Sequence, residues 1–141
     1  MFKRPATLLA ALLLTAAAAA PLPAWALAPQ DVAGRYKGSY ICNNGERWLQ
    51  LDIKRNAGQW VDVTFTFGLY QADSDNWSPA LGSFHMDGKL EGAHLALKAD
   101  YWYRAAEGYT TIDLAGDFSD NTHTFSGQVL YEGCDGFNVT R

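Results

Sequence analysis

The amino-acid sequence predicts an all-β protein, an eight-stranded antiparallel up-and-down barrel. Three observations predict this fold. Apolar and polar residues alternate with period two over most of the chain after residue 26, no stretch has a helical period, and turn-rich segments separate the alternating runs. Such alternation gives each strand one apolar face, and eight strands bury that face most simply by curling into a barrel. An open sandwich of two sheets is the alternative.

The first 26 residues differ from the rest of the chain. Lys3 and Arg4 make the N-terminal segment positively charged, and residues 6–20 are apolar. Residues 24–26 are Ala-Trp-Ala, with small residues at the two positions that a signal peptidase recognises. We therefore expect residues 1–26 to be a signal peptide and residues 27–141 to be one domain, periplasmic or secreted. A membrane anchor is the alternative, but two prolines leave an uninterrupted run that is short for a span of roughly 20 residues.

Turn residues bound the first three expected strands. Residues 43–45, Asn-Asn-Gly, and residues 56–58, Asn-Ala-Gly, favour the backbone conformations of tight turns. Between the turns, alternate positions are apolar and are expected to face inward. They are Tyr36, Gly38, Tyr40 and Cys42 in residues 34–42; Leu49, Leu51 and Ile53 in residues 47–54; and Val61, Val63, Phe65 and Phe67 in residues 59–69.

Two long breaks, residues 70–79 and 99–109, interrupt the remaining strands. The alternation places these strands at residues 81–90, 94–98, 110–118, around 125–131, and 134–141. Glycines at inward positions suit a strongly coiled sheet whose strands approach closely. The expected inward residues are Phe84, Met86, Gly88, Leu90, Leu95, Leu97, Ile112, Leu114, Gly116, Phe118, Phe125, Gly127, Val129, Tyr131, Phe137 and Val139.

The only two cysteines, Cys42 and Cys134, lie in the first and last expected strands. In an exported chain, an even cysteine count favours a disulfide over two free thiols. The bond would close a loop of 92 residues and stabilise the fold by about 4 kcal/mol. Cysteines that face each other leave Phe137 out of phase with Tyr36, which a bulge at residues 135–136 would correct. We therefore predict a barrel closed by this disulfide.

The charge balance of the expected domain is acidic. Without the expected signal peptide the chain has 9 basic and 15 acidic residues, a formal charge of −6. This balance disfavours nucleic acid and anionic membranes as partners, because both require clustered Lys and Arg. A basic protein surface would be compatible with it. We expect a monomer with no membrane span.

No group of residues predicts an enzyme. His85, His94 and His123 are each expected to be solvated, and no nucleophile is placed beside any of them. Residues 73–76, Asp-Ser-Asp-Asn, resemble the start of a calcium loop, but the twelfth position from the first Asp is Phe84 rather than Glu. A weak calcium site at this loop is the alternative to a solvated loop. We expect no catalytic site, no cofactor and no metal.

Aromatic residues concentrate in and beside the two long breaks. In a meander, successive links alternate between the two barrel ends, so both breaks and both cysteines should lie at one end. Tyr and Trp are enriched where one surface recognises another. The alternative is that these rings fold inward and plug the mouth of a filled barrel. The expected binding residues are Tyr70, Trp77, Tyr101, Trp102 and Tyr103, with Tyr109 beside them.

Residues 34–36, Gly-Arg-Tyr, and the C-terminal Arg141 resemble the calycin pattern of lipocalins and avidins, in which a late arginine covers an early G-x-W aromatic. Tyr36 stands where that family has tryptophan. The resemblance implies a cation–π contact between Tyr36 and Arg141, worth roughly 1 kcal/mol, and gives both residues a structural role. The chain is also similar to small secreted bacterial β-barrel domains, found alone or appended to envelope proteins, which have no settled activity.

These patterns predict an exported binding module. The leading hypothesis is recognition of a protein through the aromatic, acidic loop rim, as an inhibitor or immunity protein of an envelope-active enzyme. The first alternative is a calycin-like carrier of a small apolar ligand. The second is a glycan-binding domain that stacks sugars on Trp77 and Trp102. Because many aromatic side chains are expected inside the barrel, we expect a filled core with little cavity.

Overall fold

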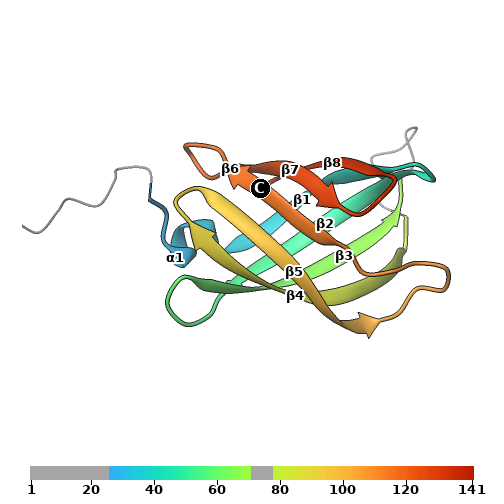
Figure 1. Cartoon of the computed structure of the whole chain (residues 1–141), viewed down its shortest axis with the longest axis horizontal. Coiled ribbons are helices and arrows are strands. Elements are labelled where there is room, and N and C mark those ends of the chain that lie inside the picture. The colour runs from blue at the N-terminus through green and yellow to red at the C-terminus, as the bar shows by residue number, and fades with distance from the viewer. Residues whose placement is uncertain (1–25, 71–77) are drawn as a thin grey trace, which may run out of the picture.

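The computed structural model describes residues 26–70 and 78–141. They form a closed barrel of eight antiparallel strands in which neighbours in sequence pair and β8 pairs with β1, as predicted (Figure 1). A short helix precedes the barrel. The elements are α1 (Pro29–Val32), β1 (Gly34–Cys42), β2 (Gly45–Arg55), β3 (Trp60–Leu69), β4 (Ala80–Glu91), β5 (His94–Arg104), β6 (Asp113–Phe118), β7 (Thr124–Leu130) and β8 (Cys134–Thr140).

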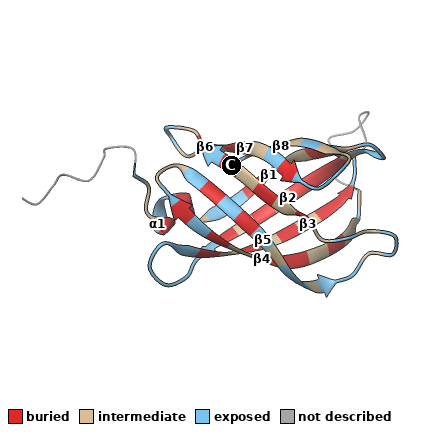
Figure 2. Ribbon diagram, in the orientation of Figure 1, coloured by how far each residue is buried: buried red, intermediate tan, exposed pale blue. Residues whose placement is uncertain are grey.

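Burial alternates along the strands, which confirms the two-residue period of the sequence (Figure 2). Nearly all the apolar residues expected inward are buried and form one core. Two residues depart from the pattern. Tyr131, expected inward, follows the end of β7 and is 52% exposed, whereas Trp48, expected outward, is only 7% exposed. The Trp48 indole is covered from outside, because it donates a hydrogen bond to the Ser78 carbonyl oxygen at 3.0 Å.

The end of the barrel beside α1 is closed. Val32 of this helix is fully buried, and the Tyr36 hydroxyl donates to the carbonyl oxygens of Val32 and Thr122, at 3.0 and 3.1 Å. The Arg141 guanidinium carbon lies 5.1 Å from the centre of the Tyr36 ring, and the same group donates to the Ala33 carbonyl oxygen at 2.9 Å. The cation–π contact implied by the calycin resemblance is therefore present.

The opposite end contains the disulfide between Cys42 and Cys134. Cys42 pairs with Cys134 and Tyr40 pairs with Phe137, so β8 has one more residue than β1 between the two pairs. The extra residue lies in residues 135–136, where the sequence predicts the bulge. At this end β1, β3, β5 and β7 finish and β2, β4, β6 and β8 begin, because the strands of a meander alternate in direction.

Strand β5 differs most from the prediction. It was expected to end at residue 98, but it continues to Arg104, so the placement of residues 101–103 in a loop is wrong. The register against β4 shifts twice: His85 lies opposite both Asp100 and Tyr101, and one further residue is inserted before Arg104. These bulges break the period-two pattern, which is why the strand cannot be recognised from alternation.

The predicted signal peptide lies outside the described residues except for its last residue. Among the residues that the structure describes, no helix has the length and apolar character needed to cross a membrane. Helix α1, four residues long, was not expected from the sequence. Its first turn is held by Asp31, whose carboxylate accepts a hydrogen bond from the Ala28 amide at 2.8 Å.

Candidate functional site

A cavity of about 290 Å³ opens at the disulfide end of the barrel. Its wall combines aromatic and apolar side chains with polar ones, among them one cation, Arg47, and one carboxylate, Glu132. Near α1 the interior contains buried side chains such as Val32, Tyr36 and Phe118, whereas the cavity at the disulfide end departs from the predicted filled core. Lining residues include Tyr40, Arg47, Phe65, Phe67, Phe84 and Tyr109. We call this space the mouth cavity.

Arg47 is the buried charge of the mouth cavity. It continues the inward series of β2, two residues before Leu49, and is 8% exposed. Its guanidinium donates through Nε to the Tyr109 hydroxyl at 3.1 Å and through its terminal nitrogens to the carbonyl oxygens of Glu46 (3.0 Å) and Asn44 (3.2 Å). A guanidinium has five N–H groups, so part of its donor capacity is left for another acceptor. Within the described residues, no carboxylate forms an ion pair with it.

Two tyrosines flank this arginine. Tyr40 is the cross-strand partner of Arg47, and Tyr109, in the β5–β6 loop, places its ring centre 5.6 Å from the guanidinium carbon. Burial raises the pKa of the Tyr40 hydroxyl far above its usual value; the nearby Arg47 charge opposes this shift only in part, and Tyr109 adds to it. Tyr40 therefore remains a neutral hydroxyl that can donate a hydrogen bond at physiological pH.

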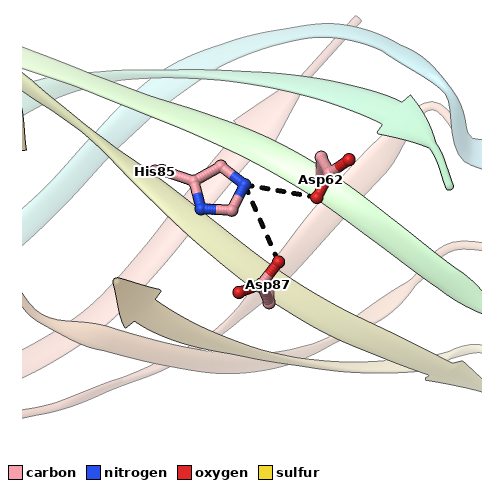
Figure 3. A group of neighbouring side chains, drawn as sticks. All are labelled: Asp62, His85 and Asp87. Carbon is pink, nitrogen blue, oxygen red and sulfur yellow. Dashed lines mark hydrogen bonds and ion pairs between the residues drawn. The ribbon is translucent and has the colours of Figure 1, made fainter. Parts of the chain in front are cut away.

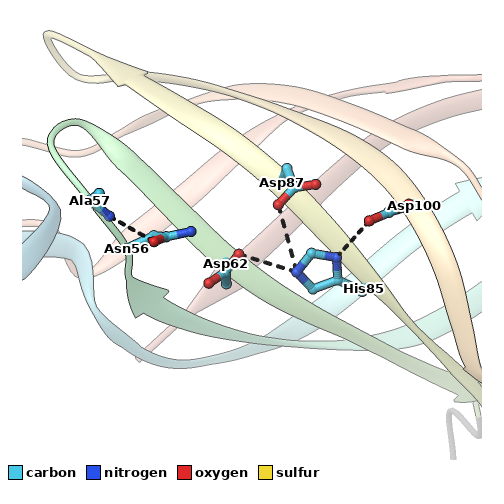
Figure 4. A network of polar contacts seen from close by, with 6 residues as sticks. All are labelled: Asn56, Ala57, Asp62, His85, Asp87 and Asp100. Atoms are coloured by element: carbon cyan, nitrogen blue, oxygen red, sulfur yellow. Dashed lines mark hydrogen bonds and ion pairs between the residues drawn. The ribbon is translucent and has the colours of Figure 1, made fainter.

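A second polar group lies on the outer face of the barrel, across β3, β4 and β5. His85 is surrounded by three carboxylates: its Nε2 lies 3.2 Å from Asp62 and 3.7 Å from Asp87, and its Nδ1 lies 3.3 Å from Asp100 (Figure 4). The Tyr101 ring stacks on the imidazole with centroids 4.8 Å apart. We call these five residues the His85 cluster. The expectation that His85 is solvated is wrong, because it is only 9% exposed.

The residues predicted to form one aromatic rim lie in different surroundings. Tyr70 follows β3 and is 48% exposed, while Tyr101 and Tyr103, 51% and 55% exposed, project from the outer face of β5. Trp102 turns inward and packs against Phe84 with ring centroids 5.3 Å apart. Trp77 and the residues of the calcium hypothesis, Asp73 and Asp75, lie outside the described residues.

Sequence reasoning missed Arg47 and the His85 cluster for different reasons. Arg47 shares the inward parity of Leu49, Leu51 and Ile53, so extending the alternation by one step would have identified it. The register between β3 and β4, which places Asp62 beside Asp87, is not readable from local sequence. The bulge that brings Asp100 and Tyr101 together over His85 is equally hidden.

The other two histidines are exposed, as expected. His94 forms one ion pair, between its Nδ1 and the Asp117 carboxylate at 3.1 Å, and His123 lies on the surface directly before β7.

No protein-family model, curated protein or solved structure matches the chain. The functional argument therefore depends on the geometry of the two sites described above.

Proposed function

We propose that this chain is an exported, non-enzymatic binding protein of calycin type that takes a small anionic ligand with an aromatic or apolar body into the mouth cavity. The observation that carries the proposal is Arg47: a buried guanidinium without a carboxylate partner among the described residues, inside an aromatic cavity. A buried charge is costly unless it is paired, so a ligand carboxylate would relieve that cost.

The cavity walls support the rest of the assignment. Phe65, Phe67 and Phe84 supply an apolar surface, and Tyr40 and Tyr109 supply hydroxyl groups next to Arg47. Binding sites for small molecules are usually apolar cavities of about 300–1,000 Å³ with a few polar groups that fix the ligand's orientation. The mouth cavity, at about 290 Å³, lies just below that range. We therefore expect a compact ligand rather than a long lipid chain.

A matched pair of probes tests this proposal. 2-Naphthoate and 2-naphthamide have the same aromatic body, but only the acid is charged, so Arg47 should make the acid bind about tenfold or more tightly. Titration calorimetry on residues 27–141 measures both affinities. The Arg47→Gln variant should lose the preference for the acid.

Two controls accompany the titration. Arg47→Lys should keep a reduced preference, because it keeps the charge but not the planar donor arrangement. Replacing Tyr101 and Tyr103 by Ala should leave both affinities unchanged, since these side chains lie on the outer face of β5. Equal affinity for the acid and the amide in the wild-type protein, or no binding of either, would show the assignment to be wrong.

The second candidate is recognition of a protein, such as an envelope-active enzyme that this chain inhibits. One observation favours it: exposed Tyr101 and Tyr103 stand beside the three carboxylates of the His85 cluster, and this combination suits a basic protein surface. A pull-down from a periplasmic extract in which the Tyr101→Ala plus Tyr103→Ala variant retains every partner would exclude this role. The glycan alternative is less well supported, because Trp102 packs inward instead of presenting a platform.

One feature is compatible with an exported protein that works in the periplasm or outside the cell. The disulfide between Cys42 and Cys134 is typical of oxidising compartments.

A further inference from the structure

Three side chains of the His85 cluster are brought together by strand pairing alone. Asp62 of β3 is the direct cross-strand partner of Asp87 of β4. His85 lies two residues before Asp87 on the same strand, so all three project from the same outer face (Figure 3). Their positions are therefore fixed by main-chain hydrogen bonds of the barrel and not by a loop.

We propose that Asp62, His85 and Asp87 bind one divalent transition-metal ion of the Zn²⁺ type. The His85 Nε2 atom lies 3.2 Å from the Asp62 oxygen and 3.7 Å from the Asp87 oxygen, and one ligand atom from each residue lies within 4.8 Å of the other two. Zinc binds such nitrogen and oxygen atoms at about 2.0–2.2 Å, so neighbouring ligands of a tetrahedral site are roughly 3.3 Å apart. Small rotations of the two carboxylates complete this geometry.

The imidazole is held in the orientation that a metal ligand needs. Asp100 lies 3.3 Å from Nδ1, and Tyr101 stacks on the ring face with an interplanar angle of 17°. Metal-binding histidines commonly donate the second ring N–H to a carboxylate, which fixes the tautomer and directs the other nitrogen at the ion. With the Nδ1 proton held by Asp100, the Nε2 lone pair faces the oxygens of Asp62 and Asp87. In this tautomer, an ion held between Nε2 and the two carboxylates would be bound by all three residues.

The charge of the surroundings favours a dication. Carboxylates placed directly opposite on adjacent strands repel each other, and here Asp62 and Asp87 share one imidazole with Asp100. Two lysines lie opposite these carboxylates on paired strands, Lys54 opposite Asp62 and Lys98 opposite Asp87, but neither forms an ion pair with them among the described contacts. Lys89 pairs with Glu91 at 3.7 Å. One dication supplies the missing positive charge.

The site is also accessible to an ion. The His85 side chain is 11% exposed, whereas those of Asp62 and Asp87 are 42% and 46% exposed, so the ligand atoms form a shallow opening above a buried ring. A surface groove lined by Trp60, Asp87 and Asp100 adjoins them. Three protein ligands leave a coordination position for water or for a group from outside. This set of one nitrogen and two oxygens suits Zn²⁺ better than Ca²⁺, which prefers oxygen alone.

Titration of untagged residues 27–141 with Zn²⁺, by calorimetry, tests the proposal. We expect one ion per chain, and Co²⁺ in its place should give visible absorption bands typical of a site with nitrogen and oxygen ligands. Asp62→Asn, Asp87→Asn and His85→Gln should each weaken Zn²⁺ binding by at least tenfold. Asp62 and Asp87 are partly exposed, so their amide variants should fold, as checked by circular dichroism.

Two further variants distinguish binding of Zn²⁺ at the proposed site from unspecific binding of Zn²⁺ to histidine and carboxylate side chains on the surface. His94→Gln removes the exposed His94–Asp117 pair and should leave the affinity for Zn²⁺ unchanged. Asp100→Asn should weaken it by about 10–100-fold, as expected for a residue that positions a ligand, while preserving the Co²⁺ bands. The proposal is overturned if the wild-type protein does not bind Zn²⁺, or if binding survives in Asp62→Asn, Asp87→Asn and His85→Gln.

Discussion

At the scale of single residues, Tyr40 shows how burial changes an ordinary side chain. It is 5% exposed, its ring lies 5.6 Å from that of Phe65, and it stands next to Arg47 across the β1–β2 ladder. The native state strongly disfavours its ionised form, because a phenolate would lose its water shell there. Because the Tyr40 hydroxyl stays neutral, it does not form an ion pair with the neighbouring Arg47. The guanidinium charge is therefore available to a ligand.

The raised pKa of Tyr40 predicts a loss of stability in alkaline solution. The pKa of an unfolded tyrosine is about 10, and the folded value is higher, so above about pH 10 the native state binds more protons than the unfolded state. The free energy of unfolding therefore falls as the pH rises through this region. Urea unfolding at about pH 9 and about pH 11 should show a smaller fall for Tyr40→Phe than for the wild type.

The control is Tyr131→Phe, because Tyr131 is 52% exposed. Its alkaline loss of stability should equal that of the wild type. A residual fall in Tyr40→Phe is expected, since burial also raises the pKa of Tyr36, although the Arg141 charge opposes that shift. Identical falls in Tyr40→Phe and the wild type would contradict the prediction.

At the scale of elements, the strands pack closely where glycines face inward. A Cβ atom built on Gly38 of β1 would lie 1.9 Å from the Asn138 carbonyl oxygen of β8. The same crowding occurs between β6 and β7, where a Cβ on Gly127 would lie 2.1 Å from the Ala115 carbonyl oxygen. Both obstacles are backbone atoms of a paired strand, so they cannot move without disturbing the ladder.

Gly38→Ala should therefore destabilise the barrel by about 1–3 kcal/mol or more, because overpacking forces the backbone apart. Gly136→Ala is the matched control on the paired strand, since its Cβ would approach the Gly127 carbonyl oxygen only to 3.1 Å. Thermal unfolding followed by circular dichroism compares the two. Similar melting temperatures for both variants would disprove the close packing of β1 on β8.

The strands also differ in how well the sequence predicts them. Regular alternation located the inward residues of β2, β3 and β4, and the phase of Phe137 against Tyr36 located the bulge in β8. Alternation failed in β5, where extra residues change which side chains face inward. It also failed at Trp48, which was expected to be outward and exposed but is covered from outside through its contact with Ser78. The His85 cluster needs the register of three strands at once, and local patterns carry no information about that register.

At the scale of the whole molecule, the β1–β8 pairing closes the barrel and the disulfide joins those two strands at the mouth. All other strand pairs join sequence neighbours. The bond connects residues 92 positions apart, so in the unfolded chain it removes the freedom of most of the domain. Cys42 and Cys134 also line the mouth cavity, which makes closure and ligand binding interdependent.

Replacing both cysteines by Ala should lower the free energy of unfolding by about 4 kcal/mol, because the open chain gains conformational entropy. Urea unfolding measures the loss, and the wild-type protein with its disulfide reduced should behave like the variant. The same variant should bind 2-naphthoate more weakly than the wild type does. Unchanged stability in the double variant would show that strand pairing alone closes the barrel.

The two ends of the described domain leave the barrel at the same pole, because Arg141 touches the Ala33 carbonyl next to α1 while the mouth cavity opens at the other pole. A polypeptide attached to either end would thus depart on the sealed side. A domain attached to another polypeptide through either terminus would therefore direct the mouth cavity away from the point of attachment.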